Sequence, residues 1–191
     1  MIGIDIIDLE EAKNKSNWQR PRFLEKLFTP QEQLYIQDSE DPSIMVWRLW
    51  SMKEAAYKLY TQIHPERFYK PKQFQCHVNA SNLKVTYKTF ECIVKTKTTS
   101  AYILSEALVL NQKTTLKVIK LGSQDYKTQS KTTKQALIGA ITHGLHLFDA
   151  KLRIVKSSFG IPSIFNHSEK LNIRISLSHH GHFGAYGFIK D

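Results

Sequence analysis

The stretch WSMKEAAYK, Trp50 to Lys58, lies in a longer segment, Ile44 to Tyr60, that contains neither Pro nor Gly. Apolar residues recur among charged ones in this segment, which predicts a long helix with one buried side. Within it, Glu54 precedes Lys58 by four residues, so the two side chains share a helix face. Judged by spacing alone, such a pair is an ordinary surface ion pair worth roughly 0.3 kcal/mol. Any chemistry that it performs therefore depends on what folds against this face of the helix.

The segments on either side of this helix predict strands and a shorter helix. The N-terminal run MIGIDIIDL is apolar and rich in isoleucine, which predicts a buried strand with Asp5 in it or at its edge. Thr29, Pro30 and Glu32 form the signature of a helix start, with a cap, a first-turn proline and a carboxylate three residues after the cap. From Phe74 to Leu110, three β-rich runs predict an antiparallel meander.

A second unit follows residue 110. NQK predicts a turn, TTLKVIKL predicts another strand, and the polar, lysine-bearing stretch LGSQDYKTQSKTTK leads into a predicted helix, QALIGAITHGLHLF. A strand in KLRIVKSS, a GIPS turn and two apolar runs around a Gly- and His-rich turn complete the chain. We therefore expect an α+β protein with two units, residues 1–110 and residues 111–191.

The composition narrows the class of partner and the compartment. With 27 basic and 17 acidic side chains among 191 residues, the net charge of +10 favours an acidic partner. No helix-turn-helix, RNA-recognition or finger signature accompanies this charge, so we do not expect nucleic acid binding. The sequence has no signal-peptide pattern and no apolar run of about eighteen residues, which predicts a cytoplasmic protein without a membrane span. Cys76 and Cys92 lack the spacing of a metal or disulfide motif, so we expect reduced, buried thiols.

Two carboxylates are candidates for a metal site. Asp5 lies at a predicted strand end and Glu54 on a predicted helix, and folding could bring both together as oxygen ligands of Mg²⁺. This ion commonly takes one or two protein carboxylates and completes its shell with water and substrate phosphate. Lys58 would then neutralise that phosphate. The alternative is that Asp5 is a turn residue and Glu54 a solvated helix residue, and spacing does not decide between the two.

The turn SHHGH, Ser178 to His182, and a group of lysines offer anion sites. Three imidazoles within four residues suggest zinc, but neighbouring histidines of an extended strand point apart and no cysteine is near, so we do not expect a zinc site. A histidine on this Gly-containing turn could instead donate to a phosphate, together with Ser178. Lys127, Lys131 and Lys134 precede or open a helix whose N-terminus suits an anion, or else they form a solvated face.

GIDIIDL, FTPQEQ, WSMKEAAYK and SLSHHG together resemble the 4'-phosphopantetheinyl transferase superfamily, whose marks are a G-x-D strand, a W-x-x-K-E-x-x-x-K helix and an S-H turn. The resemblance implies an enzyme that moves the phosphopantetheine arm of coenzyme A onto a serine of an apo carrier protein and releases adenosine 3',5'-bisphosphate. It implies Mg²⁺ as cofactor, coenzyme A as co-substrate and an acidic acyl or peptidyl carrier protein as partner. The net positive charge suits both the phosphorylated co-substrate and the acidic partner.

The resemblance also implies roles for individual residues. Asp5 and Glu54 would hold the metal, and Glu54 would also be the catalytic base that activates the carrier serine. Lys53 and Lys58 would bind the diphosphate and assist its departure. Further contacts to coenzyme A are implied for the S-H turn, the G-x-P turn and the lysine-bearing helix start, that is, for Ser178, His179, Gly160, Pro162, Lys131 and Lys134.

The order of the motifs resembles two types of the superfamily. In the two-halved, surfactin-synthetase-activating type, the G-I-D and W-x-x-K-E motifs follow the S-H motif, whereas here they precede it. The chain therefore resembles a circular permutant of two similar α/β halves related by a pseudo-twofold. The short holo-acyl-carrier-protein synthase type already has this order, but it is a single half that forms trimers. We favour the permutant, because the additional residues predict strands and a helix of their own, and this predicts a monomer with Met1 near Asp191.

Two departures from the family pattern bear on activity. Position 7 is Ile7 where the two-halved type has a third acidic ligand, so we expect two carboxylates plus water at the metal. The lysine of the family's G-K-P turn is Ile161, which leaves other lysines such as Lys156 to hold coenzyme A. The alternative to an active enzyme is a catalytically impaired relative that binds coenzyme A or a carrier protein. The helix that starts at Thr29 is our candidate for part of the carrier contact.

Overall fold

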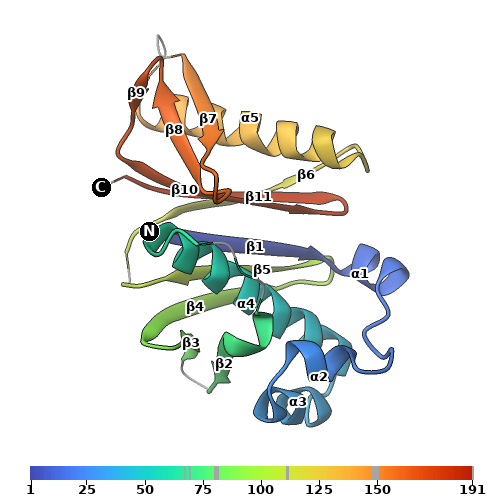
Figure 1. The fold of residues 1–191 in the computed structure, drawn as a ribbon. Coiled ribbons are helices and arrows are strands. Elements are labelled where there is room, and N and C mark those ends of the chain that lie inside the picture. Colours follow the sequence, from blue (N-terminus) through green and yellow to red (C-terminus); the bar gives the residue numbers. More distant parts are fainter. Residues whose placement is uncertain (67, 69, 80–81, 111, 148–150, 191) are drawn as a thin grey trace.

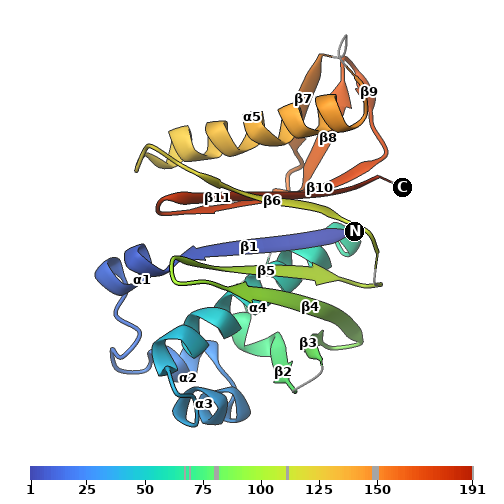
Figure 2. The ribbon, with the colours of Figure 1, turned by 180° about the vertical axis from the view of Figure 1, so that it is seen from behind.

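The computed structural model describes residues 1–66, 68, 70–79, 82–110, 112–147 and 151–190. In Figure 1, the first half of the chain (residues 1–110) lies below and the second half (residues 112–190) lies above, each with a long helix against its strands. Seen from behind in Figure 2, β1 lies beside β10 and β11 where the two halves meet. The protein is therefore an α+β protein, as its sequence predicts.

The first half contains a five-stranded antiparallel sheet in the order β1-β5-β4-β3-β2. The strands are β1 (Ile2–Asp8), β2 (Gln75–Val78), β3 (Leu83–Tyr87), β4 (Phe90–Thr98) and β5 (Tyr102–Leu108). The helices are α1 (Leu9–Lys15), α2 (Phe23–Leu27), α3 (Pro30–Gln37), α4 (Pro42–Ile63) and the short 3-10 helix η1 (Pro71–Gln73).

Helix α4 packs closely on β1 because of a glycine. A Cβ atom at Gly3 would overlap the carbonyl oxygen of Ala55 and would come within 2.7 Å of the backbone nitrogen of Leu59. A side chain at this position would therefore displace the helix from the sheet. This close approach brings the Glu54 face of α4 next to Asp5 on β1.

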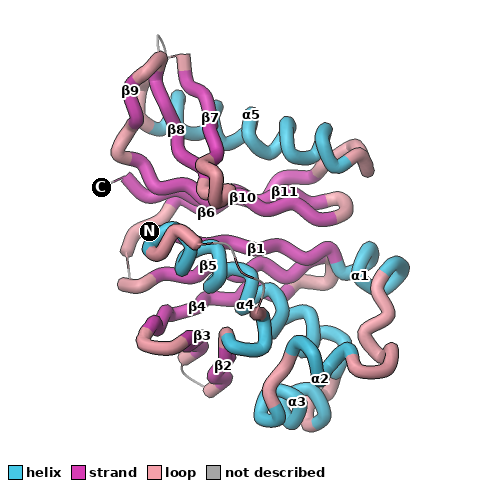
Figure 3. The backbone as a smooth tube through the Cα atoms, viewed as in Figure 1, coloured by secondary structure: helices cyan, strands magenta, loops and turns pink. Residues whose placement is uncertain are grey.

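The second half contains two smaller sheets and one long helix (Figure 3). One sheet has the order β10-β11-β6 and the other the order β7-β8-β9. The elements are β6 (Thr115–Lys120), α5 (Tyr126–Gly144), β7 (Leu152–Lys156), β8 (Pro162–Asn166), β9 (Glu169–Lys170), β10 (Ile173–His180) and β11 (Phe183–Lys190).

The two halves share an order of elements. In each, the first strand is followed by the longest helix of that half, α4 or α5. In each half, the first strand also pairs antiparallel with the last strand, and the last strand pairs with the strand before it. In the first half β1 pairs with β5 and β5 with β4, and in the second half β6 pairs with β11 and β11 with β10. The halves differ in two respects: α1, α2 and α3 lie between β1 and α4, and β7, β8 and β9 form a sheet of their own in the second half.

The halves meet along β1 and β10, and side chains make the connection. The backbone N–H groups of Ile4 and Ile6, on the edge of the larger sheet, donate to Ser176 Oγ at 3.0 Å and to Ser178 Oγ at 3.3 Å. An exposed strand edge would otherwise leave these donors unpaired. Beside this seam, apolar side chains of both halves form one shared cluster, composed of Ile2, Ile4, Ile6, Leu104, Leu108, Ala185 and Ile189.

Several local predictions from the sequence are confirmed. The N-terminal run is strand β1, and the Pro- and Gly-free segment is helix α4. The start signal at Thr29 is a capping box, in which Thr29 Oγ1 accepts from the Glu32 backbone N–H at 3.3 Å and Glu32 Oε2 accepts from the Thr29 backbone N–H at 2.7 Å. Cys76 and Cys92 are buried free thiols. No helix in the described part of the chain is long and apolar enough to cross a membrane.

Other predicted boundaries were wrong. The second β-rich run of the meander is a hairpin of β3 and β4, because the chain turns at Lys88, which has a φ of 52°. Helix α5 begins at Tyr126 rather than near Gln135, because Asp125 caps it and accepts from the Thr128 backbone N–H at 2.7 Å. The lysine-bearing stretch therefore belongs to the helix itself. Strands β8 and β9 were not predicted.

The two ends of the chain approach each other at one end of the seam. Asp191 lies outside the described residues, so its predicted position near Met1 can be followed only through its neighbours. Lys190 pairs with Ile173 on β10, and Gln62 Nε2 donates both to the Ile2 carbonyl oxygen at 2.7 Å and to the Ile175 carbonyl oxygen at 3.2 Å. The start of β1 and the end of β11 therefore lie at the same end of the seam (Figures 1 and 2).

Candidate functional site

A carboxylate, an amine and a hydroxyl from three elements meet at the junction of the halves. Asp5, on β1, is only 6% exposed. Its Oδ1 atom accepts from Lys58 Nζ of α4 at 2.8 Å and from Ser178 Oγ of β10 at 2.8 Å. Lys58 Nζ also donates to the Ile4 carbonyl oxygen at 2.9 Å. The sequence-predicted residues Asp5, Lys58 and Ser178 are therefore in direct contact.

The second carboxylate oxygen of Asp5 is unpaired. Asp5 Oδ2 is buried and has no hydrogen-bond partner among the described residues. Buried polar atoms without a partner are uncommon, and they often mark the place of a ligand or an ion. A cation with oxygen preference would satisfy this atom.

Glu54 supplies a second carboxylate, one helical turn before Lys58. Burial, first, and the negative charge of Asp5, second, together raise the pKa of Glu54 to about 7, against the opposing effect of the Lys58 ammonium. Two carboxylates that repel each other in a partly buried place are a suitable pair of ligands for a cation. The residues present therefore fit Mg²⁺ with two protein ligands plus water and substrate oxygen.

The described residues do not offer a site with three or more His, Cys, Asp or Glu ligands. The histidines of the SHHGH turn have separate partners. His179 Nδ1 bonds to Gln129 Oε1 at 3.0 Å, His180 Nδ1 accepts from the Asp8 backbone N–H at 3.0 Å, and His182 Nδ1 bonds to Asp8 Oδ2 at 3.0 Å.

Three lysines and a histidine lie near one another at the junction of the halves: Lys58 of the first half, and Lys134, Lys156 and His179 of the second. Burial lowers the pKa of His179, and the charges of Lys58, Lys156 and Lys134 lower it further. Burial likewise lowers the pKa of Lys156, again with contributions from Lys134 and Lys58. These mutual effects indicate that the three lysines lie near one another and near the imidazole of His179, whose neutral form is favoured. Such a concentration of positive charge suits a ligand with several phosphates.

The other predicted lysine of α5 is less closely connected to this group. Lys131 is exposed and lines a shallow hollow along the helix with Tyr126, Lys127 and Lys134. Lys134 thus belongs both to this hollow and to the cationic group. Lys156, one of several lysines that the sequence offered in place of Ile161, is drawn into the site because β7 ends there.

A small pocket lies at the C-terminal end of the α4 face. It has a volume of about 360 Å³, and Gln62, Ser157, Phe159 and Pro162 are among the residues that line it. Gly160, in the turn next to this pocket, has a φ of +81°, a conformation that suits glycine. Glu54, Lys58 and Gln62 follow each other at intervals of four, so one face of α4 leads from the carboxylates to this pocket. The sequence analysis did not consider Gln62, although its spacing of four residues from Lys58 places it on the same helix face as Glu54 and Lys58.

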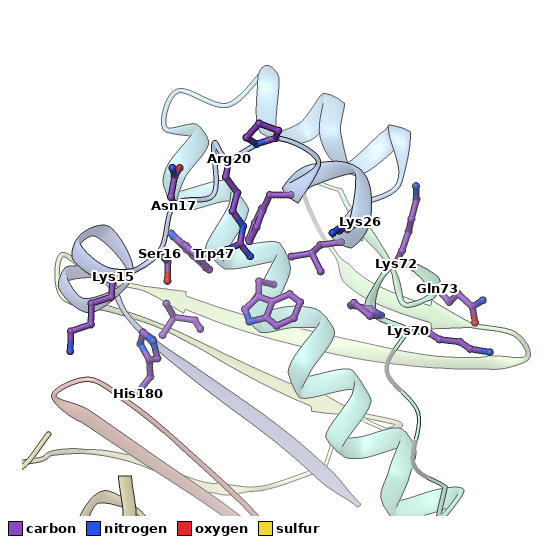
Figure 4. Close-up of a pocket in the computed structure, with 16 residues that line it drawn as sticks. Lys15, Ser16, Asn17, Arg20, Lys26, Trp47, Lys70, Lys72, Gln73 and His180 are labelled. Carbon is purple, nitrogen blue, oxygen red and sulfur yellow. The ribbon is translucent and has the colours of Figure 1, made fainter. Parts of the chain in front are cut away.

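A larger pocket lies at the N-terminal end of the same face (Figure 4). We call it the basic aromatic pocket; it has a volume of about 1000 Å³. Its aromatic residues are Phe23, Trp47 and Trp50, and no acidic side chain is among the described residues that line it. Figure 4 shows cationic side chains on both sides of Trp47. They are Lys15, Arg20, Lys26, Lys70 and Lys72.

The structure does not support a phosphate contact for Lys53. This lysine is 1% exposed, and its ammonium group forms an ion pair with Glu32, with N–O distances of 2.7 and 2.8 Å. It also donates to the carbonyl oxygens of Pro71 and Phe74. With these acceptors around it, Lys53 holds α3, α4 and η1 together, away from the carboxylates. In this structure the ammonium group of Lys53 is occupied by these acceptors, and its implied role in diphosphate binding stays a prediction.

The implied contact of Ser178 with coenzyme A likewise stays a prediction. It is buried between β10 and β1, and its hydroxyl donates to Asp5 rather than standing open to a phosphate. The carrier contact expected at the helix from Thr29 is not tested by these contacts and stays a prediction. The described residues that line the basic aromatic pocket come from the chain before Thr29, from α4, from the segment around η1 and, with His180, from β10; none comes from α3.

Comparison with models of protein families gives a match. The model of the family described as ACPS, the 4'-phosphopantetheinyl transferase superfamily, matches residues 1–110, which is more than half of the chain. No curated protein matches the chain. The matched segment contains Asp5, Glu54 and Lys58.

Proposed function

We propose, on the premise that this chain belongs to the 4'-phosphopantetheinyl transferase superfamily, that it transfers the 4'-phosphopantetheine group of coenzyme A to a serine of an apo carrier protein. Adenosine 3',5'-bisphosphate is the second product. The observation that carries the proposal is the contact of Asp5 with Lys58 beside Glu54, with Asp5 Oδ2 buried and unpaired. This arrangement combines two oxygen ligands with a cation, which is what displacement at a diphosphate requires.

Asp5 and Glu54 would hold Mg²⁺. When bound there, the ion supplies positive charge against the diphosphate of coenzyme A. The raised pKa of Glu54 supports this assignment, since part of the rise comes from repulsion by Asp5. The proposed site has two protein carboxylates, because Ile7 stands where the two-halved type has a third.

Glu54 would also accept the proton of the carrier serine. A pKa of about 7 suits a general base at neutral pH, because about half of such a group is ionised and the ionised form is basic enough to take a proton. The serine oxygen forms a bond to the phosphorus next to pantetheine, and the bond from that phosphorus to the bridging oxygen breaks. Lys58 Nζ, held by Asp5 and the Ile4 carbonyl oxygen, donates to the oxygen that departs with the bisphosphate.

The face of α4 suggests how coenzyme A lies. The nucleotide end would occupy the small pocket beside the Gly160 turn, at Gln62 and Pro162. Its 3'-phosphate would lie among the cationic groups of the second half, which are His179, Lys134 and Lys156. The pantetheine arm would then leave the carboxylates in the direction of Trp50 and the basic aromatic pocket.

The basic aromatic pocket is our candidate for the carrier contact. Its rim carries five lysine and arginine side chains, which complement an acidic partner. Trp50 precedes Glu54 by one turn of α4, so a carrier bound at the pocket would present its serine close to the proposed base. This revised location replaces the helix at Thr29.

We also propose that the two halves are copies of one unit in permuted order. The shared order of strand, helix and sheet supports this, and so does the approach of the chain ends. Asp5 and Ser178, one from each half, meet within a single chain, so the site does not need a second subunit. We therefore expect a monomer. Light scattering that shows a trimer would contradict the permutant.

Mass spectrometry of an apo carrier protein tests the proposed function. A panel of carriers is incubated with the chain, coenzyme A and Mg²⁺, and each is examined for the mass of an added phosphopantetheine. We expect a gain with the wild type and a large loss of rate with Glu54→Gln. An exposed residue, Glu40, provides the control variant Glu40→Gln, which should act like the wild type.

Two outcomes would revise the proposal. If no carrier gains mass although calorimetry shows that coenzyme A binds, the protein is the catalytically impaired relative. If Glu54→Gln transfers at the wild-type rate, Glu54 is not the base.

A further inference from the structure

A row of side chains on β10 satisfies the edge of β1. The backbone N–H groups of Ile4, Ile6 and Asp8 donate to Ser176 Oγ, Ser178 Oγ and His180 Nδ1, at 3.0, 3.3 and 3.0 Å. Alternate residues of a strand point to the same side, so these three acceptors form one face of β10. The row is the polar part of the seam between the halves.

Ser178 differs from the other members of this row. Its hydroxyl accepts from the Ile6 backbone N–H and, at the same time, donates to Asp5 Oδ1 at 2.8 Å. A hydroxyl group has a single proton to donate. Because Ser178 is only 8% exposed and its proton goes to Asp5, this hydroxyl has no proton left for a phosphate.

The bond from Ser178 determines how Asp5 presents its carboxylate. Asp5 Oδ1 receives two donors, Lys58 Nζ and Ser178 Oγ, which occupy its two lone pairs. The carboxylate is thereby fixed in rotation, and Oδ2 is the buried oxygen that has no partner among the described residues. Lys58 is long and partly exposed, whereas Ser178 is short and held by β10. The serine is the more rigid of the two constraints.

We propose that Ser178 is a positioning residue for the metal site, which orients Asp5 so that Oδ2 faces the cation, and that it does not bind a phosphate of coenzyme A. The inference rests on the proposed function for the identity of the metal. It also makes the metal geometry depend on the contact between the halves, because Asp5 and Ser178 belong to different halves. Groups that orient a metal ligand commonly change metal affinity about 10- to 100-fold when they are removed.

The test measures binding of Mn²⁺ alone to the full-length protein, by electron paramagnetic resonance of the free ion, without coenzyme A. For Ser178→Ala we expect Mn²⁺ affinity to fall about 10- to 100-fold. Ser178→Thr keeps the hydroxyl and should restore most of the affinity. The matched control is Ser176→Ala, which removes the same kind of bond to β1 but no bond to Asp5.

Coenzyme A binding in EDTA provides the second readout, measured by calorimetry. If Ser178 only positions Asp5, Ser178→Ala leaves the affinity for coenzyme A unchanged. If Ser178 binds a phosphate of coenzyme A, the same variant lowers this affinity about tenfold or more. A loss of metal-free coenzyme A affinity with Mn²⁺ affinity unchanged would therefore overturn the proposal. Equal Mn²⁺ losses in Ser178→Ala and Ser176→Ala would overturn it too, since the effect would then come from the seam in general.

The proposed function can fail separately. If the wild type binds Mn²⁺ and Ser178→Ala weakens this binding, but no carrier protein is modified, the inference about Ser178 stands and the transferase assignment does not. A wild type that binds no Mn²⁺, with or without coenzyme A, would overturn the metal site and the positioning role together.

Discussion

Replacing Glu54 by Gln should stabilise the metal-free protein at alkaline pH. Burial and the charge of Asp5 raise the pKa of Glu54 from 4.5 to about 7. A group whose pKa is raised by folding contributes stability below its unfolded pKa, and this stability is lost as the pH rises through the folded pKa. The ionised carboxylate therefore destabilises the folded chain above about pH 7, whereas a neutral Gln of similar shape does not.

The size of the effect follows from the two pKa values. Their difference, 7 minus 4.5, taken at about 1.36 kcal/mol for each pKa unit, gives about 3 kcal/mol as the full value. Because Glu54 is only partly buried, solvent screening reduces this figure, and we expect a gain of about 1–3 kcal/mol at pH 8. At pH 5, close to the unfolded pKa, we expect a gain below about 1 kcal/mol.

Urea denaturation followed by tryptophan fluorescence in EDTA, at pH 5 and at pH 8, measures these free energies of unfolding. Glu40→Gln serves as the control, because Glu40 is exposed, and it should change neither value by more than about 0.5 kcal/mol. Equal stability of the wild type and Glu54→Gln at pH 8 would refute the reasoning. A gap that is larger at pH 5 than at pH 8 would do the same, since neither burial nor Asp5 would then be acting on Glu54.

Three further predictions concern other parts of the chain. Lys53→Met should lower the free energy of unfolding by about 3–5 kcal/mol in urea, because it leaves Glu32 buried without its partner; a change below about 1 kcal/mol would contradict a structural role. Burial raises the pKa of Cys92 to about 12 and that of Cys76 well above its ordinary value, so a thiol reagent at pH 8 should modify neither cysteine in the folded protein and both in urea. Lys26→Glu, at the rim of the basic aromatic pocket, should raise the KM for the carrier about tenfold without changing the KM for coenzyme A; a change in both would place the pocket in the coenzyme A site.

The two halves contribute different charges to the site. The first half provides both carboxylates, Asp5 and Glu54, together with Lys58, and the second half provides the cationic groups around His179. The seam between β1 and β10 is where these contributions join. Changes to the seam should therefore affect the site even when they remove no catalytic residue.

The sequence alone predicted the elements whose signals are local. The cap at Thr29 and the Pro- and Gly-free run of α4 depend on neighbouring residues, and both predictions are confirmed. The start of α5 was missed because Asp125 lies in a polar stretch that resembles a loop, although it is a standard capping residue. Strands β8 and β9 were missed because short segments beside a turn carry little periodic pattern.

The sequence also determined which residues are candidates for the chemistry, but not which of them are free to act. Lys53 and Lys58 belong to one motif, yet five residues on a helix correspond to a rotation of about 140°, so they face different surroundings. Lys58 reaches Asp5, whereas Lys53 is buried against Glu32. Helical geometry indicated that the two lysines diverge, but it did not indicate which one would face the site.

The tertiary structure decided how the candidates meet. Asp5, Lys58 and Ser178 are far apart in the chain, and no local pattern encodes their contact. They meet because Gly3 lets α4 approach β1 and because serines of β10 satisfy the unpaired edge of the same strand. The sequence specifies the residue types of the site. Which oxygen of Asp5 is left unpaired depends on donors to Oδ1 from distant segments, which only the folded chain brings together.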